Sequence, residues 1–260
     1  MQPEYARALE LLRAGQTTRV WSLLVTVFGD LAQQEGDSIE GPVLTAVMGD
    51  MGIKPEATRV ALHRLRNDAW IISEKSGRTS KHSLSQLGRQ ESAAVSDVIY
   101  GKPENPNQGW QIILLETVGS YSKEVLAARG FAPLAPRLFI GSADLSPPPN
   151  TFALHADETP DWLGQQIEPT QLNEGYSSLH ERLKMITEPH LAPGALSPLQ
   201  IGVLRCLIVH NWRRLVLKHP KLPQVLATQT WRGHDCRRLV TDLLENLPRP
   251  TLNELHRTVG

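Results

Sequence analysis

The sequence predicts an α+β protein that is divided into three parts. Residues 1–101 have mostly helical apolar spacing, interrupted by one alternating stretch that contains a turn. Residues 109–188 mix strand-like apolar runs with helix-like segments, and residues 195–260 have helical spacing throughout. Breaks rich in Pro, Gly or Asn lie at 102–109 and 189–198, so we expect three domains with these bounds.

The charge pattern is local rather than global. The 260 residues hold 27 basic and 27 acidic side chains, so the formal net charge is zero. The segment from Lys54 to Arg89 is basic, whereas residues 30–50 contain acidic side chains and no Lys or Arg. Such polarity suits a domain that turns one face to phosphate groups. The alternative is two solvated surfaces of different charge.

The two cysteines, Cys206 and Cys236, are too few for a disulfide framework and fit a reducing compartment. The N-terminus lacks the layout of a secretion signal. No apolar run approaches the roughly 18 to 20 residues of a membrane-spanning helix. We therefore expect a cytoplasmic protein with no membrane partner.

Apolar spacing predicts four helices before and after the basic segment, over residues 3–14, 18–33, 39–51 and 86–99. The second contains the most regular apolar positions, and Gly36 ends its pattern. The third begins near Pro42 and ends near Gly52.

A fifth helix is predicted over residues 55–68, where Pro55 suits the first turn. Its apolar face is assigned to Ala57, Val60, Ala61 and Leu65. Trp70-Ile71-Ile72 and residues 80–84 alternate on either side of Ser76-Gly77, as the strands of a hairpin do. A helix pair followed by a hairpin is the order of a winged helix-turn-helix.

Basic and hydroxyl side chains gather on the two elements of that motif that would touch double-stranded DNA. The candidate DNA-binding residues on and before the helix are Lys54, Thr58, Arg59, His63 and Arg66, and those near the hairpin tip are Arg78, Thr79 and Lys81. Arginine can pair with guanine edges, whereas lysine more often holds phosphates. The alternative is a winged helix that contacts only another protein.

In the middle part, strands are predicted over residues 110–118, 138–141 and 151–155. Helices are predicted over the segments 120–129, 159–167 and 171–188. This order in about 80 residues favours a small ferredoxin-like α/β domain. The last part is predicted to be all-helical, over residues 198–218, 223–226 and 233–247.

Several of these segments resemble the PaaX-type repressors, which control phenylacetic acid degradation. The run Ser22-Leu23-Leu24-Val25-Thr26-Val27-Phe28-Gly29-Asp30 is similar to the opening helix of that family, and Arg59-Val60-Ala61-Leu62-His63-Arg64-Leu65 to its recognition helix. His210-Asn211-Trp212-Arg213-Arg214 and Trp231-Arg232-Gly233-His234 resemble segments near the family's C-terminus. The matches occur in the family's order from about Arg19 to Leu247.

The resemblance implies a repressor of aromatic-acid catabolic genes that binds an inverted-repeat operator as a homodimer. It also implies release by an aryl-CoA thioester, such as phenylacetyl-CoA. Phosphates need cations and an acyl group needs an apolar slot. The candidate effector-binding residues are Trp212, Arg213, Arg214, Lys218, Trp231 and Arg232. The alternative is that both tryptophans pack helices and the arginines pair with carboxylates or solvent.

No catalytic motif is found, because the sequence lacks a Gly-x-Ser-x-Gly elbow, a phosphate loop and a dinucleotide fingerprint. Cys206 falls in an apolar helix, where a core role is expected. His210, His219 and His234 with Asp235 and Cys236 are metal-ligand types, but their spacing fits no zinc signature. We expect no enzyme, no metal site and no cofactor.

Overall fold

The computed structural model combines helices with two antiparallel sheets, which makes the protein α+β, as predicted. It divides into two compact units, each built from separate segments of the chain. The first unit comprises residues 1–101, 179–214 and 239–260, and the second comprises 102–178 and 215–238. The residues predicted as one C-terminal domain, 195–260, therefore contribute to both units. The structure describes residues 3–14, 19–77, 79–101, 109–156, 158–167, 170–187, 193–218 and 224–259.

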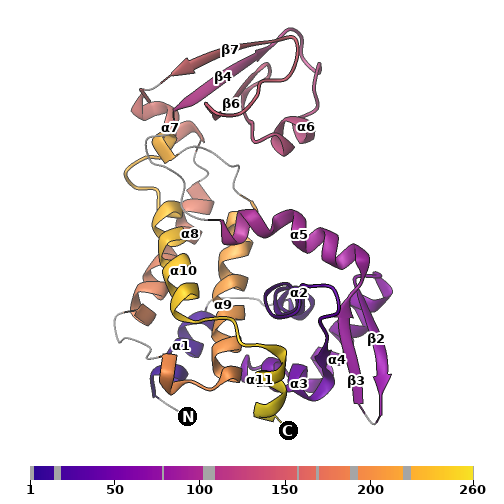
Figure 1. Ribbon diagram of the computed structural model, residues 1–260. Coiled ribbons are helices and arrows are strands. Elements are labelled where there is room, and N and C mark those ends of the chain that lie inside the picture. The colour runs from indigo at the N-terminus through magenta and orange to yellow at the C-terminus, as the bar shows by residue number, and fades with distance from the viewer. Residues whose placement is uncertain are drawn as a thin grey trace. The chain divides into compact units, whose positions relative to one another are not determined.

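The N-terminal part of the first unit follows the predicted order with one change (Figure 1). Its elements are α1 (Pro3–Arg13), α2 (Val20–Leu31), β1 (Ile39–Glu40), α3 (Gly41–Asp50), α4 (Pro55–Asn67), β2 (Ile71–Ser76), β3 (Thr79–Leu84) and α5 (Gln86–Tyr100). Helix α3 starts at Gly41, next to the predicted start near Pro42, but the predicted range 39–51 is wrong for its first two residues. Ile39 pairs with His82 and Glu40 with Lys81, so these two residues form an edge strand instead.

The resulting sheet has the order β1-β3-β2, and β2 and β3 form a hairpin from Ile71↔Leu84 to Ser76↔Thr79. Gly77 turns the chain with a φ of 61°, a region that glycine adopts without a Cβ clash. The hairpin lies beside α4 in Figure 1. A Cβ at Gly88 would lie 2.2 Å from the carbonyl oxygen of Trp70, so α5 approaches the base of the hairpin through a glycine.

Helix α2 is the centre of this part, because α4 packs against it and its side chains Leu24, Val27 and Phe28 are fully buried. Burying such side chains contributes about 1.5–3 kcal/mol each. The buried face thus fixes the position of α4, whose other face is open to solvent.

C-terminal helices complete the first unit. They are α11 (Leu252–Val259), all but the end of α9 (Pro198–Val216), and the later parts of α8 (Thr170–Thr187) and α10 (Gly233–Asn246), whose starts belong to the second unit. Short 3-10 turns are η1 (Pro193–Ala195) and η2 (Gln224–Leu226). Trp212 on α9 donates its indole N–H to the carbonyl of Ile99 on α5. The side-chain amide of Asn211 donates to the carbonyl of Leu12. Helix α11, which was not predicted from the sequence, packs against α3 and buries Leu255.

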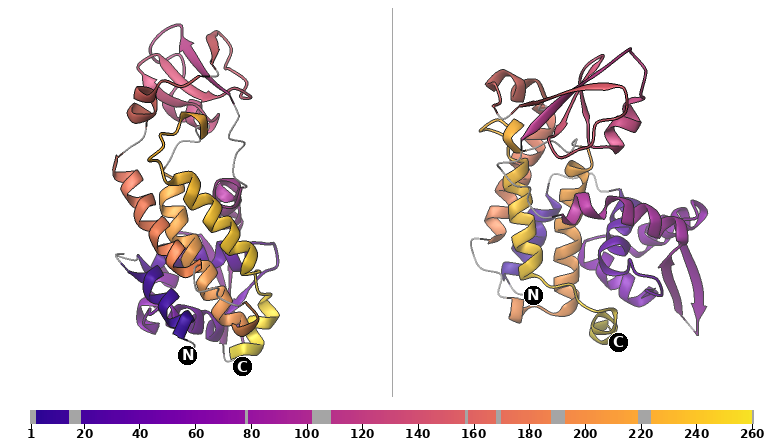
Figure 2. Two further views of the ribbon diagram at one scale, coloured as in Figure 1. Left: turned by 90° about the vertical axis from the view of Figure 1, so that its left-hand side faces the viewer. Right: turned by 45° about the horizontal axis from the view of Figure 1, so that its top comes forward.

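The second unit contains β4 (Trp110–Leu115), α6 (Lys123–Ala128), β5 (Ala132–Ala135), β6 (Leu138–Ser142), β7 (Thr151–Ala156) and α7 (Asp161–Ile167). The strands pair antiparallel in the order β5-β6-β4-β7, and Figure 2 shows them as one sheet. Leu126 of α6 joins the core on one face of the sheet, and Leu163 of α7 joins the core on the other. Strand β5 was not predicted, because Pro133 lacks the N–H that a strand interior needs. The strand forms because β5 is at the edge of the sheet, where proline is tolerated. The connection between β6 and β7, residues 143–150, contains no helix.

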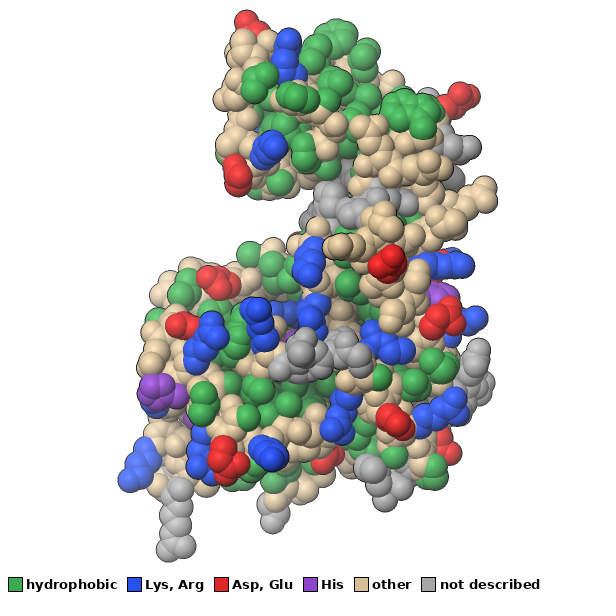
Figure 3. Space-filling view, turned by 180° about the vertical axis from the view of Figure 1, so that it is seen from behind, with side chains coloured by type: hydrophobic (Ala, Val, Ile, Leu, Met, Phe, Trp, Pro, Cys, Tyr) green, Lys and Arg blue, Asp and Glu red, His purple; other side chains and the backbone are tan. Residues whose placement is uncertain are grey.

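Part of this sheet is left open to solvent. Figure 3 shows hydrophobic side chains gathered on the surface of the second unit. The large exposed ones in that unit include Phe152 and Leu154 on β7 and Trp162 on α7.

Candidate nucleic-acid interface

Helix α4 has one face buried in the core and one face exposed to solvent. Pro55 occupies its first turn and Glu56 places a carboxylate near the N-terminal end of the helix dipole. Thr58, Ala61 and Leu65 are buried against the rest of the unit. Since successive residues of a helix are about 100° apart, these three fix the direction of every other side chain.

The outward face differs from the predicted one at two positions. Thr58 is 3% exposed and its hydroxyl donates to the carbonyl of Lys54, so the expectation that Thr58 faces DNA is wrong. Val60, assigned to the core, is 71% exposed. Val60 was predicted to be buried because it is apolar, and Thr58 to be exposed because it is polar. The helical spacing of Thr58, Ala61 and Leu65 is the signal that could have identified the buried face.

Exposed polar side chains make up the rest of this face. They include Glu56, Arg59, His63, Arg66 and Asn67, and Lys54 is exposed just before the helix. A guanidinium nitrogen of Arg59 lies 3.6 Å from the Glu56 carboxylate, and the amide of Asn67 lies 3.2 Å from His63 Nδ1. Both contacts are solvent-exposed, so they hold the side chains only weakly. Arg59 and His63 are therefore available to a partner.

Arg64 has a structural role. Its guanidinium lies 4.8 Å from the centre of the Trp21 ring on α2, and its Nε is 3.5 Å from Asp68. This cation–π contact joins α4 to α2 rather than to a partner.

The hairpin, whose strand β2 packs against α4, carries a further basic side chain. Lys81 on β3 is 3.7 Å from the carboxylate of Glu40 on β1. Thr79 is partly buried at the start of β3, and Arg78 lies outside the described residues. His82 Nδ1 is 2.8 Å from the hydroxyl of Ser73, and burial together with the charge of Arg66 lowers the pKa of His82. The positive charge of Arg66 on α4 therefore acts on His82 of the hairpin.

The effector candidates are spread over both units. Trp212, Arg213 and Arg214 belong to the first unit, whereas Lys218, Trp231 and Arg232 belong to the second. Trp212 is 1% exposed, as its packing alternative predicts. Burial lowers the pKa of Arg213, opposed by nearby Tyr100. Arg214 and Lys218 are exposed.

Trp231 and Arg232 also have partners within the second unit. The rings of Trp231 and Tyr176 meet edge to face with centroids 5.1 Å apart. The guanidinium of Arg232 is 3.0 Å from the Asp235 carboxylate, which Arg238 also contacts. Burial raises the pKa of Asp235, but hydrogen bonds from Arg238 and Arg232 outweigh this and lower it overall. This fits the alternative of a carboxylate-paired cationic face.

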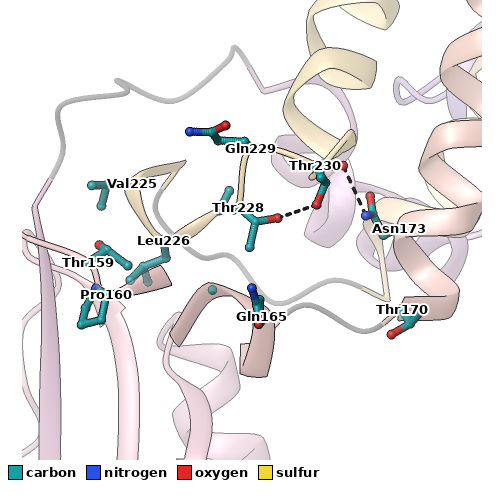
Figure 4. Close-up of a pocket in the computed structure, with 12 residues that line it drawn as sticks. Thr159, Pro160, Gln165, Thr170, Asn173, Val225, Leu226, Thr228, Gln229 and Thr230 are labelled. Carbon is teal, nitrogen blue, oxygen red and sulfur yellow. Dashed lines mark hydrogen bonds between the residues drawn. The ribbon is translucent and has the colours of Figure 1, made fainter. Parts of the chain in front are cut away.

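A pocket of about 690 Å³ lies within the second unit, between α7, the start of α8 and the segment around η2 (Figure 4). None of the six effector candidates lines it. Its described lining is uncharged, with hydroxyl and amide side chains beside a few apolar ones: Thr159, Pro160, Gly164, Gln165, Thr170, Asn173, Val225, Leu226, Ala227, Thr228, Gln229 and Thr230. It suits a neutral group with several hydrogen-bonding atoms better than phosphates.

Cys206 is fully buried on α9, and burial raises the pKa of its thiol well above the usual range. A nucleophile would need the opposite, a thiolate open to substrate.

Among the described residues, no cluster of three or more His, Cys, Asp or Glu side chains could hold a metal ion. No helix in the described ranges is both long and apolar enough to span a membrane.

An exposed basic helix and an adjoining hairpin, set on a buried helical core, form the kind of surface that nucleic-acid-binding regulators present. Family comparisons agree with that class. The sequence model of PaaX-like proteins matches residues 19–88, and that of the PaaX-like protein C-terminal domain matches residues 168–256. The two together cover more than half of the chain, which belongs to the PaaX-like family.

One characterised relative is the transcriptional repressor PaaX of Escherichia coli K12. The two are 26% identical over 253 residues, which cover 87% of this chain and 79% of that protein. The solved structure of an uncharacterised protein from Mycobacterium tuberculosis is also similar, with a TM-score of 0.53 and 19% identity. It covers 91% of this chain and 97% of that one, a likeness of fold alone.

Proposed function

We propose that this protein is a cytoplasmic transcriptional repressor that binds double-stranded DNA through α4 and the β2–β3 hairpin. The observation that carries the proposal is the outward face of α4, where Arg59, His63 and Arg66 are exposed in a chain with no net charge. The helix would enter the major groove, where side chains reach base edges, and the hairpin would lie on the backbone as a wing. Membership of the PaaX-like family supports this role over an enzymatic one.

The order of helices and strands around α4 supports a winged helix-turn-helix. Strand β1 precedes α3 and α4, and the hairpin follows them and pairs with β1 in one sheet. In the second unit, the strand order supports a ferredoxin-like domain that lacks its second crossover helix.

A homodimer on an inverted-repeat operator is the second element of the proposal. Edge strand β7 supports it, because exposed Phe152 and Leu154 lie on an edge with no proline, lysine or bulge to block pairing. The opposite edge, β5, carries Pro133 and an irregular register. Light scattering should show a dimer that Phe152→Lys weakens; a dimer unaffected by this change would place the contact elsewhere.

The third element is release by an acyl-CoA thioester such as phenylacetyl-CoA. Family membership supports it, and the pocket in the second unit could hold the neutral pantetheine or acyl portion. The thioester would favour a dimer conformation whose α4 helices no longer match half-sites roughly 34 Å apart.

The test is fluorescence anisotropy with DNA from upstream of the protein's own gene and with random DNA, at several salt concentrations. We expect tighter, salt-dependent binding to one sequence, and its loss on adding phenylacetyl-CoA but not free CoA. Selective DNA binding that phenylacetyl-CoA does not change would overturn only the proposed effector and leave the proposed DNA binding intact. Absence of salt-dependent binding to any DNA would instead favour a winged helix that binds a protein.

A further inference from the structure

Val60 is an exposed apolar side chain on α4, the helix that is proposed to bind DNA. Its exposed fraction, 71%, is the highest among the large hydrophobic side chains of the described ranges. Helices α2 and α3 and strand β2 pack against α4, but they bury Thr58, Ala61 and Leu65 on the opposite side. Val60 therefore points away from the core of its own chain.

Helix stability does not explain this side chain. A β-branched residue has a lower helix propensity than Ala, Lys or Glu, and an exposed one gains no burial energy. Single exposed hydrophobic residues are common on protein surfaces, so exposure alone would decide nothing. What distinguishes Val60 is its neighbours.

Val60 lies between two polar pairs on the same face of α4. Arg59 and Glu56 precede it, and His63 and Asn67 follow it one and two turns on. A protein-binding surface is usually built around several adjoining apolar side chains. One apolar group among cationic and polar ones instead matches a partner that is negatively charged and has isolated apolar groups.

The major groove of DNA has that composition. Its floor presents hydrogen-bonding edges between rows of phosphates, and its one apolar feature is the C5-methyl group of thymine. We propose that Val60 contacts this methyl group and so specifies a thymine at one position in each half-site. This inference rests on the proposed function. Arg59 would hold a neighbouring base or phosphate.

Deoxyuridine tests this contact, because it differs from thymine only in lacking the methyl group. Selection from a random DNA library would first give a preferred sequence for the wild-type protein. Each thymine of that sequence is then replaced by deoxyuridine, and the Kd of the wild-type and Val60→Ala proteins is measured by anisotropy. For the wild type, we expect about a three- to tenfold weaker Kd at one position per half-site. Val60→Ala should bind the thymine site about as weakly and should no longer respond to the replacement.

Val118→Ala is the matched control, because Val118 is 70% exposed but lies in the second unit. It should keep the wild-type response to deoxyuridine. Thermal unfolding should show that Val60→Ala is as stable as the wild type, since alanine favours the helix.

Selective binding that no single methyl removal weakens would overturn the role of Val60 and leave the proposed function intact. An equal response of Val60→Ala and wild type to deoxyuridine would do the same. A wild-type protein that selects no sequence would overturn both proposals.

Discussion

Arg205 and Asp30 form a two-point ion pair inside the first unit, although 175 residues separate them in the chain. Arg205 Nε is 3.1 Å from one carboxylate oxygen and Nη2 is 3.0 Å from the other. Arg205 also donates to the carbonyls of Leu244 and Leu247, and Asp30 accepts from the hydroxyl of Tyr100. The pair thereby joins α2, α5, α9 and the end of α10.

Removing Arg205 should be costly, because the buried Asp30 would be left with the partly exposed Arg249, 3.7 Å away, as its charged partner. We expect Arg205→Met to lower the free energy of unfolding by about 3–5 kcal/mol, measured by urea titration. The double variant Asp30→Leu/Arg205→Met should regain part of the loss. Arg257→Met, at an exposed position on α11, is the control and should change it by less than about 0.5 kcal/mol. A loss below about 1 kcal/mol for Arg205→Met would contradict the structural role.

Arg59→Ala should reduce base preference as well as affinity. Loss of a bidentate contact to a base edge costs about 1–3 kcal/mol, so binding to the preferred sequence should weaken while binding to random DNA changes little. Anisotropy with both DNAs measures this difference. Arg129→Ala, at an exposed position in the second unit, should alter neither Kd. Equal weakening on both DNAs would assign Arg59 to phosphate instead.

Thr58→Val should leave DNA binding within about twofold of the wild type, because Thr58 is buried and faces α2 and its surroundings rather than solvent. The variant keeps the shape of the side chain and loses one 3.3 Å hydrogen bond to the Lys54 carbonyl. The expected change in unfolding free energy is about 0.5–1.5 kcal/mol. A tenfold loss of affinity in a stable Thr58→Val protein would show that the helix binds DNA by another face.

Lys81→Ala should weaken binding to all sequences alike. A lysine that contacts one phosphate contributes about one unit to the slope of log K against log salt, and this unit should disappear. Glu40→Gln gives the opposite test, because it removes the carboxylate 3.7 Å from Lys81 and should strengthen DNA binding. If both variants kept the wild-type salt slope, the hairpin would not contact the backbone.

His210 should make the protein less stable in acid. Burial, followed by the charges of Arg213 and Arg214, lowers the pKa of His210 from the ordinary histidine value of 6.5 to about 3. Between these values the unfolded chain binds the proton and the folded protein does not, so stability falls as pH drops from 6.5 toward 3. The slope is at most about 1.4 kcal/mol per pH unit from this group.

His210→Gln should remove this contribution, and the difference between variant and wild-type unfolding curves across that pH range measures it. Some acid sensitivity should remain, because burial also lowers the pKa of His234, to about 4. Identical pH dependence in the two proteins would contradict this, because it would show that His210 has the same pKa in the folded and unfolded states.

Local patterns in the sequence predicted most helices and the hairpin. Pro55 marks the start of α4, and Ser76-Gly77 marks the turn between β2 and β3. These signals depend on backbone preferences and side-chain spacing over a few residues. The family resemblance was also carried by contiguous motifs, and the comparisons confirmed it.

Contacts between segments that are distant in the chain determined the features that these local patterns did not predict. Ile39 and Glu40 form a strand only because they pair with His82 and Lys81 of β3, which lie 43 and 41 positions further along the chain. Thr58 turned inward and Val60 outward because Ala61 and Leu65 set the buried side of α4. The sequence by itself therefore determined which segments are helical, turn-forming and basic, since those properties are local. Only the tertiary structure decided which side chains of α4 face a partner, and that Asp30 and Arg205 share one core, because burial depends on segments that meet in space.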